Sequence, residues 1–193
     1  ETGHGDIDGE GGIPSRNPEE LLEVLTLLTW SASALSESAH PVPAPLSAAI
    51  LRMAPALRTL RHADGELARF HGGGKGLEGR LDQALAASGT RPGVPQSIAM
   101  GFARLSGRRT SVIVDASPPP GGRAALTAHA STAAFELTSG RRALIVSCGP
   151  GEAFGPDWHR AARATPSHSV LTMDSASSSR LGPKGELLDD RAR

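Results

Sequence analysis

The sequence predicts a mixed α and β fold, in which an N-terminal helical hairpin precedes a mainly antiparallel, β-sandwich-like domain. Apolar residues recur at helical spacing within the first 61 residues, whereas short apolar runs follow one another at close intervals from about residue 97. Glycine or proline punctuates most of the gaps between these runs. Because no helical segments alternate with the runs, we do not expect the parallel sheet of an α/β fold.

The first helix is expected to begin after Asn17, the predicted N-cap. Pro18 is tolerated in a first helical turn, and Glu19 and Glu20 suit the positive end of the helix dipole. Apolar residues then continue through Trp30. These signals predict a helix over about residues 18–30.

A polar, proline-containing connection leads to a second expected helix at about residues 46–61. Its apolar positions recur every three or four residues: Ile50, Met53, Leu57 and Leu60. The two helices resemble an antiparallel hairpin that is too small to close a core alone. We therefore expect leucines such as Leu21, Leu25, Leu57 and Leu60 to be exposed in the chain by itself.

The remaining elements are predicted as short strands. A turn at residues 63–65 leads to a short strand at 66–71, and residues 77–87 form either a short helix or an irregular loop. Five further strands are expected at residues 97–105, 110–116, 133–138, 142–148 and 169–174. The predicted division is therefore a helical segment, 1–62, and a β-sandwich-like unit, 63–193.

Charge and cysteine content exclude several classes of protein. Lysine plus arginine equals aspartate plus glutamate, 20 against 20, so no net field attracts nucleic acid, and we expect no nucleic-acid partner. One cysteine excludes an intrachain disulfide and leaves the compartment, cytoplasm or periplasm, open. The longest apolar run has about half the length of a bilayer span, so no membrane span is expected. Neither an initial methionine nor a signal peptide is present, and we expect a fragment.

Two histidines are candidate metal ligands because each stands beside an expected strand. His129 precedes the strand at 133–138, and His168 precedes the strand at 169–174. Two imidazoles on neighbouring strand ends could hold a divalent ion such as zinc, which usually needs a third ligand. The alternative is that each histidine only fixes a strand end through hydrogen bonds. Asp157 and His159 are weaker candidates on an expected loop.

Arginines are candidate binding residues for an acidic polysaccharide, because guanidinium groups pair with carboxylates and sulfates in bidentate fashion. Arg160 and Arg163 are the candidates for substrate binding, and Arg163 also suits a structural role. Five more arginines stand near the expected hairpin turns: Arg104, Arg108, Arg109, Arg141 and Arg142. At these turns, a solvated rim is the simpler interpretation. Cys148 is interpreted as a buried, inert thiol.

Three segments resemble the C-terminal β-sandwich region of the heparinase II/III family of polysaccharide lyases. They are GFARLSGRRTSVIVDASPPP, AHASTAAFELTSGRRALIVSCG and RATPSHSVLTMDSASSSR. Upstream, GGIPSRNPEELLEVLTLL is similar to the end of the α/α toroid that precedes the sandwich in that family. The resemblance covers roughly residues 11–180. It implies that residues 1–62 are the tail of a toroid, whose remainder belongs to the full-length chain, and that the sandwich is incomplete.

The resemblance also implies roles for individual residues. Lyases of the family carry a motif like His-Gly-His-Ala-Asp, in which the first histidine is catalytic and the second helps to bind a structural metal. Matching it to LTAHAS puts Thr127 at the catalytic position and His129 at the metal position. His168 falls on a second metal position, and Ser147 falls on the family's aspartate. The implied cofactor is a divalent metal such as zinc, with its carboxylate ligand missing.

Two functional hypotheses follow, and a domain without any site is the third. The first is a fragment of a bacterial, periplasmic polysaccharide lyase, a carbon–oxygen lyase that cleaves uronate-containing glycosaminoglycan by β-elimination. The family draws much of this chemistry from the toroid, including a tyrosine, and this chain has none, so the fragment itself is predicted to be inactive. The second is a non-catalytic carbohydrate-binding or structural homologue, which Thr127 favours.

Overall fold

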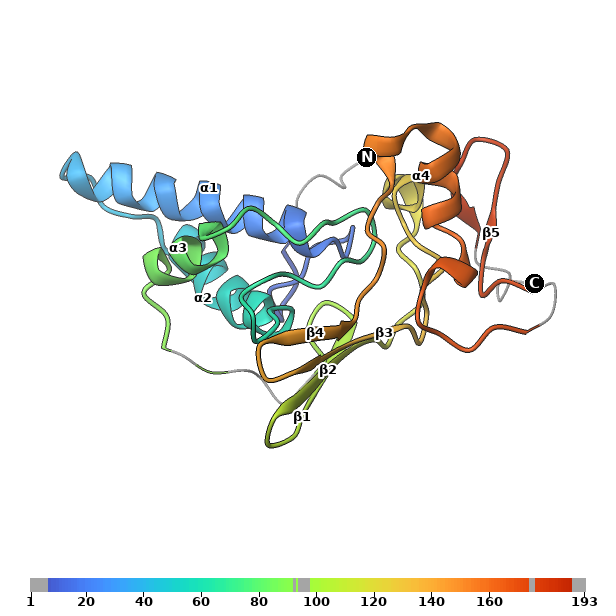
Figure 1. The fold of residues 1–193 in the computed structure, drawn as a ribbon. Helices are drawn as coiled ribbons and strands as arrows, with labels where there is room; N and C mark the ends of the chain where they lie inside the picture. Colours follow the sequence, from blue (N-terminus) through green and yellow to red (C-terminus); the bar gives the residue numbers. More distant parts are fainter. Residues whose placement is uncertain (1–6, 92, 94–97, 174–175, 189–193) are drawn as a thin grey trace.

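The computed structural model describes residues 7–91, 93, 98–173 and 176–188. Three helices, α1 (Pro18–Glu37), α2 (Ala44–Thr59) and α3 (Arg80–Ala87), gather on one side of a four-stranded sheet. The short helix α4 (Pro156–Ala162) and strand β5 (Arg180–Leu181) lie at the other side of the molecule (Figure 1). The mixed α and β class predicted from the sequence is confirmed.

Helix α1 begins where the capping signals predict. The Asn17 side chain accepts hydrogen bonds from the backbone N–H of Glu19 at 2.9 Å and of Glu20 at 3.2 Å. The helix does not end near Trp30 but continues to Glu37, so the prediction of a connection there was wrong. Four of the seven residues at 31–37 are alanine, leucine or glutamate, which favour helix, and the three serines do not outweigh that preference. Residues 80–87 are helical, which decides the alternative left open for 77–87.

The central sheet has the order β1-β2-β3-β4 and is antiparallel throughout, as expected. Its strands lie within the predicted segments or one residue beyond them: β1 (Phe102–Ser106), β2 (Thr110–Asp115), β3 (Phe135–Ser139) and β4 (Arg142–Ile145). A two-residue pair, β5 (Arg180–Leu181) and β6 (Leu187–Leu188), forms a separate small sheet. Three 3₁₀ turns complete the list: η1 (Gly122–Leu126), η2 (Glu152–Phe154) and η3 (Thr165–Ser167).

The predictions of strands at 66–71 and 169–174 were wrong. In the segment 66–71, the N–H of Leu67 donates to the carbonyl of Lys75 and the N–H of Ala68 donates to Leu60, so the segment folds as a loop against the end of α2. Within 169–174, the described residues form only an isolated bridge at Met173, and residue 174 lies outside the described residues.

One hydrophobic core joins the helices to the sheet. Its side chains come from α1, α2, the loop that follows α2, and the sheet, among them Leu21, Leu57, Phe70, Phe102 and Ile113, each with no exposed surface. The core thus crosses residue 62, and the predicted division into two units stays a prediction. The expectation that the helix leucines would be exposed was wrong, because the sheet and the loop cover them. Among the described residues, no helix is long and apolar enough to cross a membrane.

Candidate functional site

Three buried histidines meet where the helical part of the chain contacts the loops that flank the sheet. His71 comes from the loop after α2, His129 follows η1, and His168 follows η3. The ring centroids of His71 and His129 are 6.0 Å apart, and those of His129 and His168 are 5.0 Å apart with the rings stacked. At most 7% of any of the three residues is exposed. We call these residues the histidine cluster.

Backbone hydrogen bonds assign the protons within the histidine cluster. The N–H of His129 donates to Nδ1 of His71 at 3.2 Å, and the N–H of Gly72 donates to Nε2 of His129 at 3.0 Å. A nitrogen that accepts a hydrogen bond carries no proton, so the neutral rings are protonated at Nε2 of His71 and at Nδ1 of His129. The first of these faces Oδ2 of Asp115 at 3.2 Å. Both nitrogens are buried, and neither forms a hydrogen bond with a described residue, although Nε2 of His71 lies close to the carboxylate of Asp115.

Asp115, the last residue of β2, is the negative centre beside the histidine cluster. Its carboxylate is fully buried, forms an ion pair with Arg16, and accepts a hydrogen bond from the Ser131 hydroxyl at 2.7 Å. Burial raises the pKa of Asp115, but His71, Arg16 and Ser131 outweigh it and hold that pKa below its usual value. Arg16 also donates to the carbonyls of Met100 and Gly101. This network ties the loop before α1 to the sheet.

The environment keeps the three imidazoles uncharged at neutral pH. The pKa of His168 is lowered to about 4, mainly by burial and secondly by the neighbouring His71, while Asp115 opposes the change. Burial also lowers the pKa of His129 well below its usual value, and the pKa of His71 falls although Asp115 opposes it. Neutral stacked imidazoles therefore fill this part of the interior.

The structure brings together the three residues that the resemblance assigns to a metal. Oγ of Ser147 lies 3.1 Å from Nδ1 of His168, and His168 stacks on His129 with 25° between the ring planes. A metal ion binds imidazole nitrogen in the plane of the ring, and two stacked rings do not direct their nitrogens at one point. Among the described residues, no group of three or more His, Cys, Asp or Glu side chains is placed to hold a metal. Metal binding by His129 and His168 stays a prediction, and the rings as they lie do not fit it.

Thr127 occupies the position that the resemblance assigns to a catalytic histidine. The residue is half-buried at the end of η1, and its hydroxyl donates to the carbonyl of Ala124 at 3.4 Å. It packs beside Gly72, whose backbone holds His129. A threonine hydroxyl has no ionisation near neutral pH, so this position supplies neither a general base nor a general acid.

The two arginines predicted to bind substrate differ in their surroundings. Arg163 is 3% exposed, and its guanidinium donates to the carbonyls of Ala128 and Ala125, each at 2.8 Å. Arg160 is exposed and borders a hollow of about 540 Å³ together with Arg163. Arg163 thus holds the segment before His129 in place through these hydrogen bonds. Substrate binding by either arginine stays a prediction.

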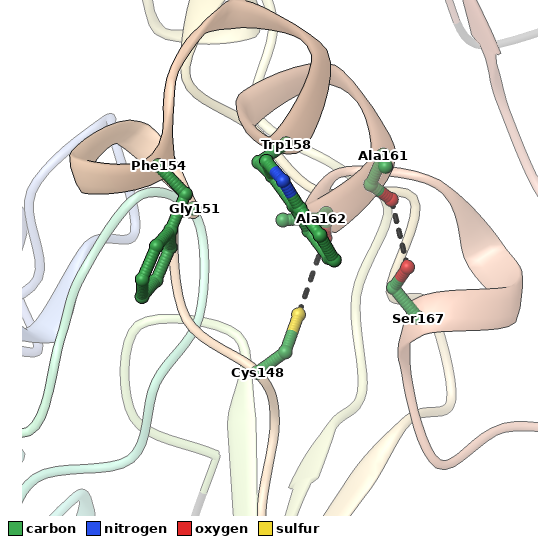
Figure 2. A pocket seen from close by; sticks show the side chains of 7 residues that line it. All are labelled: Cys148, Gly151, Phe154, Trp158, Ala161, Ala162 and Ser167. Carbon is green, nitrogen blue, oxygen red and sulfur yellow. Dashed lines mark hydrogen bonds between the residues drawn. The ribbon is translucent and has the colours of Figure 1, made fainter.

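Cys148 borders an apolar hollow of about 410 Å³ beside α4 (Figure 2). Phe154 and Trp158 flank this hollow, edge to face, and both are largely exposed. The interpretation of Cys148 as buried was wrong, because the residue is exposed. Partial burial nevertheless raises the pKa of its thiol, and the sulfur contacts the carbonyls of Gly149 and Ala162. The thiol is therefore protonated at neutral pH, as expected of an inert cysteine. Asp157 and His159, the weaker candidates for metal binding, lie on helix α4 and not on the expected loop. Nδ1 of His159 contacts the carbonyl of Pro150.

Sequence reasoning missed His71, Asp115 and Arg16. The sequence predicts His71 only as the last residue of a strand at 66–71 and Asp115 only as part of the strand at 110–116. One signal was available, since a charged residue within the apolar strand TSVIVD is rarely buried without a partner. The sequence offers no comparable signal that the partner is Arg16, 99 residues away.

A helical segment packed on an antiparallel sheet, with buried histidines at the junction, is the class of structure that this chain adopts. The model of the family described as heparinase II/III-like, C-terminal, matches residues 90–192, more than half of the chain. The chain belongs to this family. FtsZ-localized protein C of Caulobacter vibrioides is 38% identical over 145 residues, which are 73% of this chain and 25% of that protein.

Solved lyases share the fold. A heparan sulfate lyase from Pedobacter heparinus superimposes with a TM-score of 0.65 and 17% identity, covering 90% of this chain and 32% of that chain. A heparinase III structure gives a TM-score of 0.68 and 16% identity, covering 89% and 31%. The chain therefore spans about a quarter of the curated relative and about a third of each lyase chain.

Proposed function

We propose that this chain is a non-catalytic, structural region of a heparinase II/III-like protein. The observation that carries the proposal is the pairing of Thr127, bonded to its own turn, with a histidine cluster that is buried and uncharged. β-Elimination of a uronate polymer needs a base that reaches the proton beside the carboxylate and an acid that reaches the leaving oxygen. A buried imidazole whose accepting nitrogen is already bonded to a backbone N–H serves neither role.

The relative from Caulobacter supports this proposal. Its printed name describes a location with FtsZ, and such a location does not require cleavage of a polysaccharide. It also shares more sequence identity with this chain than these solved lyases do, 38% against 13–18%. We infer that this chain serves as a scaffold, with its histidine cluster bracing the contact between helices and sheet.

The second candidate is the lyase itself, with its base and acid elsewhere in the full-length protein. The fold likeness to heparan sulfate lyases over about nine tenths of this chain favours it. In that case acidic polysaccharide is the substrate class, the periplasm is the expected compartment, and this chain contributes one wall of the cleft.

A lyase assay separates the two candidates. Both this chain and the full-length protein are incubated with heparan sulfate, heparin and other uronate polymers, and unsaturated uronate is followed by its ultraviolet absorbance. A characterised heparan sulfate lyase is the positive control. We expect no product from either protein. Product from the full-length protein alone supports the second candidate, and product from this chain overturns both the proposal and the predicted inactivity of the fragment.

A further inference from the structure

The motif Ser-Gly-Arg-Arg occurs twice, at residues 106–109 and 139–142. The first copy makes the turn between β1 and β2, and the second makes the turn between β3 and β4. In the sheet register Thr110 faces Ser139, and the N–H of Gly140 donates to the carbonyl of Arg109 at 2.5 Å. The two turns therefore lie side by side at the same end of the sheet. We call their four arginines, Arg108, Arg109, Arg141 and Arg142, the arginine turns.

The arginine turns carry positive charge that the described chain does not neutralise. All four residues are exposed, and none of them forms an ion pair with a described acidic residue. Arg104 differs, since it donates to the carbonyls of Thr59 and Arg61. A hollow of about 350 Å³ is bordered by four arginines: Arg104, Arg108, Arg109 and Arg141. Within the described residues, this end of the sheet is thus a cationic surface whose arginines form no ion pairs, in a chain of zero net charge.

Acidic side chains do approach Arg141 from the loops on the helical side. Asp64, Glu66, Glu78 and Asp82 border a neighbouring hollow together with Arg141. Two of these carboxylates are already committed, Glu66 to Arg69 and Lys75, and Asp82 to Arg61. The loops therefore leave the cationic surface largely unneutralised.

The turn at residues 139–142 leads directly into β4, which is an edge strand of the sheet. β4 is the last strand in the sheet order, so no strand of the described chain pairs with its outer edge. Every residue from Arg141 to Leu144 is exposed, and two apolar side chains on this edge meet solvent, Leu144 at 59% and Val146 at 37%. An open edge with exposed apolar side chains is a template for an added strand.

We propose that the outer edge of β4 docks an extended protein segment that carries acidic side chains beside the arginine turns and apolar side chains beside Leu144 and Val146. The edge offers main-chain hydrogen bonds, and the arginines complement carboxylates in bidentate pairs. Neither turn nor β4 carries an aromatic residue on which a sugar ring stacks, so a polysaccharide fits this edge less well. A bilayer surface would reach only the tips of the two turns. An extended segment that runs beside β4 would reach the arginines and also Leu144 and Val146, which lie farther along the chain.

The test uses a fluorescent synthetic peptide with two aspartates followed by alternating valine and threonine, and fluorescence anisotropy with the full-length protein. We expect binding that weakens with salt, and an affinity lower by about tenfold in the Arg141→Glu, Arg142→Glu double variant. Leu144→Ser lowers it by about threefold, because one apolar contact is lost. The matched controls are Arg91→Glu and Leu171→Ser, both exposed elsewhere, and they leave the affinity unchanged.

Four results overturn the proposal. The first is no binding of the peptide to the full-length protein, as when another part of that protein covers the edge. The second is equal binding of the peptide by the wild type and the double variant. The third is equal binding of a peptide with lysines in place of the aspartates. The fourth is arginine-dependent binding of heparan sulfate oligosaccharide or of anionic lipid vesicles without binding of the acidic peptide. A circular dichroism melt of each variant confirms that it is folded.

Discussion

The histidine cluster and the arginine turns are two polar groups built in opposite ways. Both combine residues from distant parts of the sequence, but the cluster is buried, uncharged and bonded to the backbone. The turns are exposed and charged, and they form no ion pair with the described acidic residues. Burial of a polar group is costly unless the group is hydrogen-bonded or neutral, so the cluster is organised for the stability of the fold. Exposed charge carries little such cost, so the turns are free to serve a partner.

Removing the buried carboxylate gives the largest expected effect. Asp115→Ala leaves Arg16 buried without its counter-ion and removes the carboxylate that Nε2 of His71 faces. We expect a loss of about 3 to 5 kcal/mol in the free energy of unfolding, measured by urea denaturation. Glu23→Ala, at an exposed site on α1, is the control and changes it by less than about 0.5 kcal/mol. If Asp115→Ala changes the free energy of unfolding as little as the control does, the proposed contrast between the histidine cluster and the arginine turns is wrong.

Acidification is expected to weaken the histidine cluster selectively. The pKa of His168 is about 4 in the folded chain and about 6.5 when it is exposed, so the unfolded state takes up a proton first as the pH falls. Its contribution is therefore fully present above pH ~6.5 and is lost between pH ~6.5 and 4, by about 3 kcal/mol in all.

The His168→Gln variant tests this pH dependence. Glutamine retains a polar contact with Ser147 and does not titrate, so the fall in stability from pH 7 to 4.5 becomes shallower, although His129 and His71 still contribute. His40→Gln, at an exposed histidine, leaves the slope unchanged. Parallel pH profiles for the wild type and His168→Gln contradict the assignment of His168 as a buried neutral group.

Asn17, the N-cap of α1, is a partly buried hydrogen-bond acceptor, so its burial is intermediate between that of the histidine cluster and that of the arginine turns. Asn17→Ala removes the bonds to the N–H groups of Glu19 and Glu20 and is expected to cost about 1 kcal/mol in thermal or urea unfolding. Asn17→Asp keeps an acceptor and serves as the matched variant. Equal losses in both variants indicate that packing rather than capping matters there.

The smallest effect on stability is expected at the arginine turns. Replacing Arg141 and Arg142 with alanine removes two exposed side chains that form no ion pair within the described part of the chain. It changes the free energy of unfolding by less than about 0.5 kcal/mol. Urea denaturation beside Asp115→Ala makes the comparison direct. A loss above 1 kcal/mol shows that the arginines serve the fold itself.

Sequence reasoning found the elements whose signals are local. The start of α1, the span of α2 and the four strands of the central sheet follow from a capping residue, helical spacing and turn residues, which act within a few positions. It failed where another part of the chain took the backbone bonds, as at residues 66–71, and where composition misled, as at 31–37. The grouping of His129, His168 and Ser147 followed from the family resemblance, and their roles stay predictions.

The sequence by itself determined the class of fold, the family and the repeated Ser-Gly-Arg-Arg turns, because these depend on residues close together in the chain. Only the tertiary structure decided that His71 lies with His129 in the histidine cluster and that Asp115 lies beside it. It also decided that Arg163 is a buried brace and that the imidazoles are uncharged. Burial and the approach of distant charges set these properties, and both arise only when segments far apart in the chain pack together.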